Sequence, residues 1–166
     1  HYTIDLPDRN GASLGVLDSS GASLPAQVTP GADDTATLSF VAAVEPNGTA
    51  TYTLATDGQA AQAPVAVKTT RDDGALVMAN ALLAVKTPPP QHQTFDTPVP
   101  ANTLPAPVLA FKGSDTPWRG AGALLHDRPV TSFRVHQTAD GPVFTEIHYR
   151  LDYAGGGWYE ALVRVT

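Results

Sequence analysis

Apolar and polar residues alternate along most of the chain. Tyr2, Ile4 and Leu6 begin the pattern, and "TATLSFVAAV" (35–44) and "TATYTL" (49–54) repeat it. A period of two predicts half-buried β-strands, because successive side chains of a strand point to opposite faces. Turn residues recur about every ten positions, a spacing typical of sandwiches and barrels. The pattern therefore predicts an all-β protein with an antiparallel β-sandwich architecture.

The second half of the chain continues the strands after one long break. Asp73-Gly74 predicts a hairpin, followed by a strand over 81–87. The stretch "GALVMANALLAVK" can also be drawn as a helix, but its adjacent valines and the Asp-Gly turn favour strands. Residues 88–107 contain "PPP", "TPVP" and "LPAP". Prolines at this density favour an extended, unpaired path, so we expect a linker or an arm packed on a sheet.

These features divide the chain into two packed sandwich-like units. A length of 166 residues suits one large β domain or two small ones. We expect a small β-sandwich unit over 1–60. The second β-sandwich unit covers 61–166 and contains the Pro-rich connection 88–107.

The letters "DYAGGGWYE" near the C-terminus raise a choice between a ligand-binding loop and a turn. Pairing Asp152 with Trp158 places the apolar residues of both flanking strands on one face and Arg150 opposite Glu160 on the other. A one-residue slip would exchange the faces. We therefore predict a hairpin, with glycines supplying positive φ angles in the connection 153–157. The same register pairs Leu151 with Tyr159, Tyr149 with Ala161, Ile147 with Val163, Thr145 with Val165, Glu146 with Arg164 and His148 with Leu162.

Composition excludes several classes of protein. The chain has no cysteine, which excludes disulfides, thiolate metal sites and cysteine nucleophiles. Its net charge of −6 argues against nucleic acid and anionic membrane as partners. No apolar run approaches the roughly 18 residues of a membrane span, so we expect no membrane insertion. The many Thr and Ala residues and the few charged ones are typical of secreted bacterial β proteins, which predicts an extracellular location.

The densest group of ionisable residues lies near the C-terminus. In one interpretation, a carboxylate beside a histidine and arginines performs acid/base chemistry on an acidic sugar. In the other, the group is the solvated face of an antiparallel sheet. The apparent pairing of opposite charges favours the second. The group consists of Arg134, Glu146, His148, Arg150, Glu160 and Arg164.

The histidines give no motif for a metal or a catalytic triad. None of the five forms an H-x-H or H-x-x-x-H pair, so we expect no metal and no cofactor. In His126-Asp127, the adjacent carboxylate could orient the imidazole for catalysis. The nearest serines, Ser114 and Ser132, lie in no nucleophile elbow. We therefore predict no catalytic residues.

Two tryptophans offer the largest stacking surfaces. An exposed indole on a β-sandwich loop can hold the flat apolar face of a sugar, and in "TPWRG" Arg119 is placed to reach a carboxylate or hydroxyl of the same glycan. The alternative is a core aromatic or a lid over the end of a sheet. The predicted ligand-binding residues are Trp118, Arg119, Trp158, Tyr159, His148 and Arg150.

Several stretches resemble β-sandwich modules of large secreted carbohydrate-active enzymes. "VLDSSGASLPAQV" (16–28) and "LSFVAAVEPNGTATYTL" (38–54) are similar to the segment after the catalytic domain of α-mannosidase-type glycoside hydrolases. "LVMANALLAV" (76–85) and "GPVFTEIHYRLDYAGGGWYEALVRV" (141–165) resemble a super-sandwich of the rhamnogalacturonan-lyase-like type. In such enzymes the catalytic groups usually lie in other regions. The resemblance therefore implies a fragment or accessory domain that is not catalytic by itself.

Three functions follow. The first is a non-catalytic β-sandwich portion of a secreted bacterial carbohydrate-active enzyme that supports or presents polysaccharide. The second is a structural subunit of an extracellular filament or surface layer, self-associating through edge strands and the Pro-rich arm. The third is a complete polysaccharide lyase or hydrolase that uses the charged face of residues 146–164.

Overall fold

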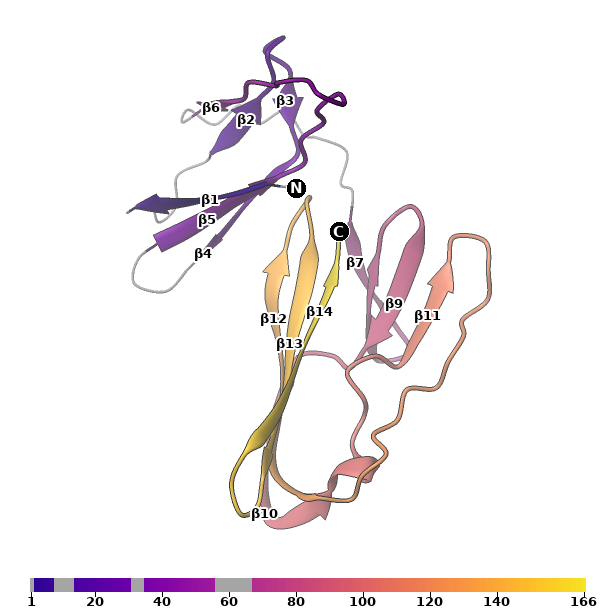
Figure 1. Cartoon of the computed structure of the whole chain (residues 1–166). Helices are drawn as coiled ribbons and strands as arrows, with labels where there is room; N and C mark the ends of the chain where they lie inside the picture. The colour runs from indigo at the N-terminus through magenta and orange to yellow at the C-terminus, as the bar shows by residue number, and fades with distance from the viewer. Residues whose placement is uncertain (1, 8–13, 31–34, 56–66) are drawn as a thin grey trace. The chain divides into compact units, whose positions relative to one another are not determined.

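The chain is almost entirely β-structure. The computed structural model describes residues 2–7, 14–30, 35–55 and 67–166. Its strands form four antiparallel sheets (Figure 1), which confirms the predicted all-β class. By contacts the chain divides into two compact units: His1–Ala66 with Gly141–Val143, and Val67–Asp140 with Phe144–Thr166.

The first unit contains two three-stranded sheets, ordered β1-β5-β4 and β3-β2-β6. Val16 and Leu38 are fully buried in a common apolar cluster. The rings of Phe40 and Tyr52 pack edge-to-face within it, with centroids 5.3 Å apart. The strands are β1 (Tyr2–Pro7), β2 (Gly15–Leu17), β3 (Ser23–Leu24), β4 (Ala26–Pro30), β5 (Thr35–Phe40) and β6 (Thr53–Ala55).

The first unit contains hydrogen-bonded turns at residues 18–21 and 45–48. The Asp18 carboxylate accepts hydrogen bonds from the Ser20 hydroxyl at 2.6 Å and from the Ala22 and Ser20 amides at 2.9 and 2.8 Å. These bonds, first the one from the hydroxyl, lower the pKa of Asp18. Asn47 has a φ of 60° in the turn "EPNG". The strand expected over 35–44 is shorter than predicted, because β5 ends at Phe40.

The second unit is built from two four-stranded sheets, here called the front sheet, ordered β10-β12-β13-β14, and the back sheet, ordered β11-β9-β8-β7. A short 3₁₀ helix, η1, follows β10. The strands of the front sheet are β10 (Gln91–Pro100), β12 (Pro129–Asp140), β13 (Thr145–Tyr153) and β14 (Trp158–Val165). The back sheet contains β7 (Lys68–Asp72), β8 (Ala75–Ala79), β9 (Leu83–Thr87) and β11 (Ala110–Gly113), and η1 covers Ala101–Thr103.

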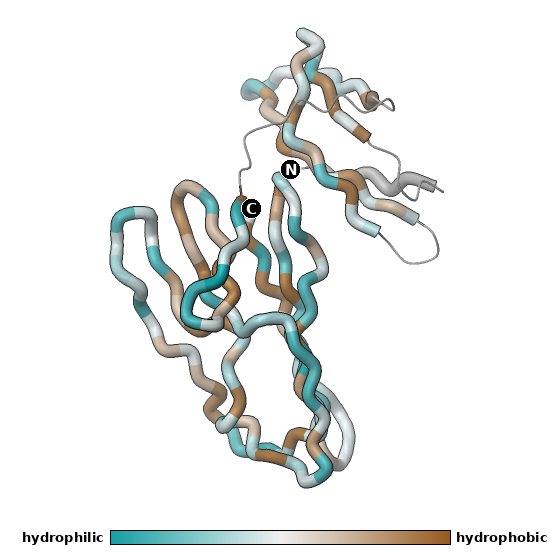
Figure 2. The backbone as a smooth tube through the Cα atoms, turned by 180° about the vertical axis from the view of Figure 1, so that it is seen from behind, coloured by the Kyte–Doolittle hydropathy of each residue, from teal (hydrophilic) through white to brown (hydrophobic). Residues whose placement is uncertain are grey.

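The core of the second unit lies between the front and back sheets. Along β13, Ile147, Tyr149 and Leu151 have no exposed surface, and they share a buried cluster with Met78 and Val85 of the back sheet. In Figure 2, brown apolar segments recur between polar ones along the strands, as the period of two requires. Burying each large apolar side chain contributes about 1.5–3 kcal/mol relative to exposing it. The sandwich therefore fixes which face of each front strand points to solvent.

The Pro-rich segment contains strand β10, so the expected unpaired path is wrong for the residues of that strand that pair with β12. Strand β10 pairs antiparallel with β12, and the ladder is interrupted between Thr94 and Val99. The location of Pro98 and Pro100 fits an edge strand, because β10 has a hydrogen-bonded neighbour on one side only. Further on, the carbonyl of Pro105 accepts a 2.7 Å hydrogen bond from the buried Tyr149 hydroxyl. The segment is thereby attached both to the sheet and to the core.

The C-terminal hairpin has the predicted register. Strands β13 and β14 pair from Asp152↔Trp158 to Thr145↔Val165, with Arg150 opposite Glu160. The three glycines of the turn have φ angles of 84°, 92° and 82°. The amide of Tyr153 donates to the Gly157 carbonyl at 3.1 Å and closes the turn. The stretch for which a helix was the alternative forms β8 and β9.

Candidate binding face

The outer side of the front sheet is a polar face made by all four strands. On β13, His148 and Arg150 alternate with the buried core residues and therefore point outward. Cross-strand pairing then places residues of the neighbouring strands beside them in rows. One row runs His92, Arg134, Arg150, Glu160; the next contains His136, His148 and Leu162; on the other side lie Thr94, Ser132, Asp152 and Trp158.

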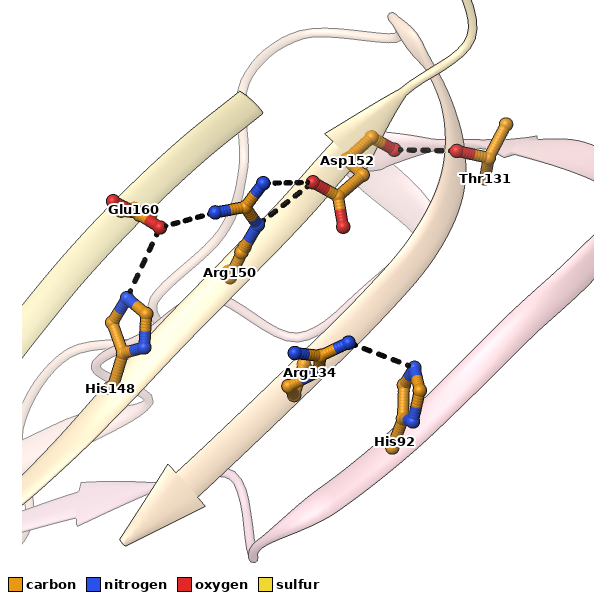
Figure 3. A network of polar contacts seen from close by, with 7 residues as sticks. All are labelled: His92, Thr131, Arg134, His148, Arg150, Asp152 and Glu160. Atoms are coloured by element: carbon orange, nitrogen blue, oxygen red, sulfur yellow. Dashed lines mark hydrogen bonds and ion pairs between the residues drawn. The ribbon is translucent and has the colours of Figure 1, made fainter. Parts of the chain in front are cut away.

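Arg150 is the centre of a charge network on this polar face (Figure 3). Its guanidinium contacts Asp152 Oδ1 at 2.7 Å and Glu160 Oε1 at 2.7 Å. These two hydrogen bonds, first the one to Asp152, raise the pKa of Arg150. His148 Nε2 lies 3.4 Å from the same Glu160 oxygen. Arg150 is therefore a fixed, permanently charged group with both acidic neighbours already engaged.

Arg134 differs from Arg150 in its partners. It lies directly opposite Arg150 across the sheet, and its Nη2 is 3.5 Å from His92 Nε2 (Figure 3). Among the described residues it forms no ion pair with a carboxylate. Two guanidinium groups thus lie side by side while only Arg150 is neutralised. The polar face has a local excess of positive charge at Arg134.

Trp158 is an exposed aromatic surface on the same face. Its side chain is 62% exposed, and the Arg150 guanidinium lies 5.3 Å from the ring centroid. Such cation–π packing is worth about 0.5–1 kcal/mol at an exposed site. The next residue, Tyr159, points to the inner side of the sheet, where its ring packs edge-to-face on Tyr149 at 6.0 Å. Tyr159 therefore does not contribute its ring to the polar face.

Trp118 lies on the opposite side of the sandwich. Its ring is half-buried between Lys86 and Lys112, whose ammonium groups lie 4.7 and 5.0 Å from the centroid. Lys86 alternates with core residues of β9 and points away from the core; it also pairs with Asp72 at 2.8 Å, which lowers the pKa of that carboxyl. Arg119 is exposed beside Trp118. Of the six predicted ligand-binding residues, the structure brings together only His148, Arg150 and Trp158.

Glu146 and His126, two candidates for acid/base chemistry, are engaged with other partners. Glu146 is buried to 9% exposure, pairs with Arg164 at 2.7 Å and accepts a hydrogen bond from Thr138 at 2.7 Å. Between Glu146 and His148 the described residues show no hydrogen bond. His126 shares a 3.2 Å hydrogen bond with the Tyr153 hydroxyl rather than with a serine. In the described part of the chain, no cluster of His, Asp and Glu can hold a metal ion.

Two residues of the polar face, His92 and His136, were absent from the sequence-based site. His136 follows the same alternation as Arg134 along β12, so its outward position could have been read from the period of two. His92 lies in the segment that was expected to be unpaired. Its position beside Arg134 depends on the pairing of β10 with β12, which no local pattern encodes.

The fold and this face define an all-β protein of sandwich-like units that presents a charged sheet face to solvent. No protein-family model matches the chain, and neither the curated proteins nor the solved structures contain a match. The likeness to carbohydrate-active enzymes therefore rests on the sequence motifs alone. No helix among the described residues is long and apolar enough to span a membrane.

Proposed function

We propose that this chain is a non-catalytic β-sandwich portion of a secreted carbohydrate-active enzyme, and that its polar face binds an acidic polysaccharide. The observation that carries the proposal is the exposed Trp158 indole, held by Arg150 on a face that also presents the unneutralised Arg134. The flat apolar side of a sugar ring covers an indole well. A guanidinium binds a carboxylate through two parallel hydrogen bonds.

The spacing of these groups favours a chain over a single sugar. Trp158 is on β14 and Arg134 is on β12, two strands away and one row along. From the strand spacing and the rise per residue, their Cα atoms are roughly 12 Å apart. A ligand that stacks on Trp158 and also reaches Arg134 must therefore be longer than one monosaccharide.

The net charge of −6 opposes an acidic ligand at long range. At physiological ionic strength, however, exposed charges are screened beyond about 8 Å, so the groups in contact decide the affinity. On the polar face, the guanidinium groups of Arg134, Arg150 and Arg164 lie among three carboxylates, and Arg134 pairs with none of them in the described structure. We therefore expect binding to weaken with added salt.

The test is calorimetric titration of the chain with an oligogalacturonate and with a neutral malto-oligosaccharide of equal length. We expect the acidic ligand to bind and the neutral one to bind more weakly. Loss of a charge-assisted hydrogen bond is worth about 1.5–3 kcal/mol, so Arg134→Gln should weaken binding by about 10- to 100-fold. Trp158→Ala should also weaken it, through lost stacking.

Trp118→Ala is the matched control, because it removes the same kind of side chain from the opposite side of the sandwich. It should leave the affinity unchanged. Equal losses from Trp118→Ala and Trp158→Ala would contradict the assignment to the polar face. Absence of binding to either oligosaccharide would contradict the proposed function.

A further inference from the structure

The two edges of the front sheet are unlike. The β10 edge contains Pro98, Pro100 and an interruption of its hydrogen-bond ladder. These features hinder the pairing of a further strand with this edge. The β14 edge contains no proline or glycine over its eight residues, and no described strand pairs with its outer side. It exposes Leu162, whose side chain is 67% accessible. Such an edge is a template for strand addition.

The side chains of β14 are complementary to a second copy of themselves. Two identical strands that pair antiparallel about a two-fold axis place residues of the same face opposite one another, so the axis must pass beside a single residue. If that residue is Leu162, each Glu160 faces Arg164 of the other copy, and the two Leu162 side chains face each other. Opposite charges directly across a pair are stabilising.

The neighbouring registers lack this complementarity. An axis at Glu160 would oppose two carboxylates, and an axis at Arg164 would oppose two guanidinium groups. An axis at Ala161 or Val163 would place a charged residue opposite Leu162. Only the register centred on Leu162 satisfies every charge, and on the inner side it pairs Ala161 with Val163, which continues the apolar face.

The charges on β14 are already aligned for such a pairing. Within one copy, Glu160 contacts Arg150 and Arg164 contacts Glu146, each at 2.7 Å. Pairing across the axis would connect these into rows of alternating sign: Arg150, Glu160, then Arg164 and Glu146 of the second copy. Neither existing pair has to break, because Glu160 uses only one carboxylate oxygen in its described contacts.

We propose that two copies of this chain associate through their β14 edges, antiparallel and centred on Leu162, to form one continuous eight-stranded sheet. A two-fold interface uses the same edge on both copies and closes on itself. The assembly is therefore a dimer, not a filament. This inference is independent of the proposed polysaccharide binding.

Light scattering over a hundredfold concentration range tests the dimer with the full chain. We expect the mass to rise from one to two copies and then remain constant. Leu162→Lys and Leu162→Glu each place like charges opposite one another at the axis, and each should raise the dissociation constant by roughly tenfold or more. An equimolar mixture of the two variants should recover the dimer, because residue 162 then faces the opposite charge.

Leu125→Lys is the control, since this residue is 96% exposed and lies outside the front-sheet strands. It should leave the dissociation constant unchanged. A wild-type monomer at every concentration would overturn the proposal, as would a mass that grows beyond two copies. Failure of the mixed variants to associate, where wild type dimerises, would show that residue 162 does not face itself and would overturn the register.

Discussion

Tyr149→Phe tests whether the hydrogen bond from the Tyr149 hydroxyl to the Pro-rich segment stabilises the second unit. The ring has no exposed surface and packs on Phe133 with centroids 5.3 Å apart, while the hydroxyl donates to the Pro105 carbonyl at 2.7 Å. Phenylalanine keeps the ring, so no large cavity forms. The substitution removes the buried hydroxyl donor and leaves the Pro105 carbonyl without this hydrogen bond. We expect it to lower the free energy of unfolding by about 1–2 kcal/mol. For a unit of this size, each kcal/mol lowers Tm by about 4–8 °C.

The assay is urea unfolding near neutral pH, followed by tryptophan fluorescence. Both tryptophans belong to the second unit, so the signal reports on that unit alone. The matched control is Tyr159→Phe, because the Tyr159 ring is 38% exposed and its hydroxyl makes no hydrogen bond to the described residues. We expect its effect to lie within about 0.5 kcal/mol. Equal effects of the two substitutions would refute the assigned role of the hydroxyl.

We also expect Tyr149 to make the free energy of unfolding depend on pH in the alkaline range. Burial, with smaller contributions from Tyr159 and Tyr153, raises the pKa of Tyr149 above its usual value. The unfolded chain therefore loses this proton first, and the folded state loses stability as pH rises above about 10, by up to about 1.4 kcal/mol per pH unit. Tyr149→Phe should remove that part of the slope. An unchanged slope in the variant would show that Tyr149 does not cause it.

Two further predictions concern the hairpin turn and an exposed ion pair. Gly156→Ala should destabilise the second unit by about 1–2 kcal/mol in thermal unfolding, because the φ of 92° is unfavourable for any residue with a Cβ atom; an unchanged Tm would show that the turn rearranges at no cost. Lys86 lowers the pKa of Asp72, so their interaction contributes above the ordinary aspartate pKa and is lost as pH falls through the folded value. Asp72→Asn should therefore flatten the decrease of Tm on acidification, and a parallel curve would contradict this.

The C-terminal hairpin could be predicted in detail because two independent patterns agree on one register. The apolar face and the opposite charges at Arg150 and Glu160 both fail after a one-residue slip. The same register places the Trp158 side chain on the outer face of the sheet. The information is local, since it lies within two consecutive strands and their turn.

The partners of β10 and of Trp118 could not be predicted in the same way. Proline density in residues 88–107 hides the period of two, and the pairing with β12 joins residues far apart in sequence. Trp118 lies in a loop without periodicity, so nothing in its neighbourhood identifies Lys86 and Lys112 as its contacts. The sequence-based site therefore grouped two tryptophans that the sandwich places on opposite faces.

The two proposals for the front sheet are compatible because one involves backbone groups at the edge of the sheet and the other involves side chains on its outer face. Pairing at the β14 edge uses backbone groups that lie in the plane of the sheet, whereas Trp158 and Arg134 project perpendicular to it. In the register centred on Leu162, Trp158 lies at the end of the paired segment, opposite Thr166 of the second copy. Its indole therefore stays uncovered by the partner strand. Association would double the polar face without covering the groups that we propose bind polysaccharide.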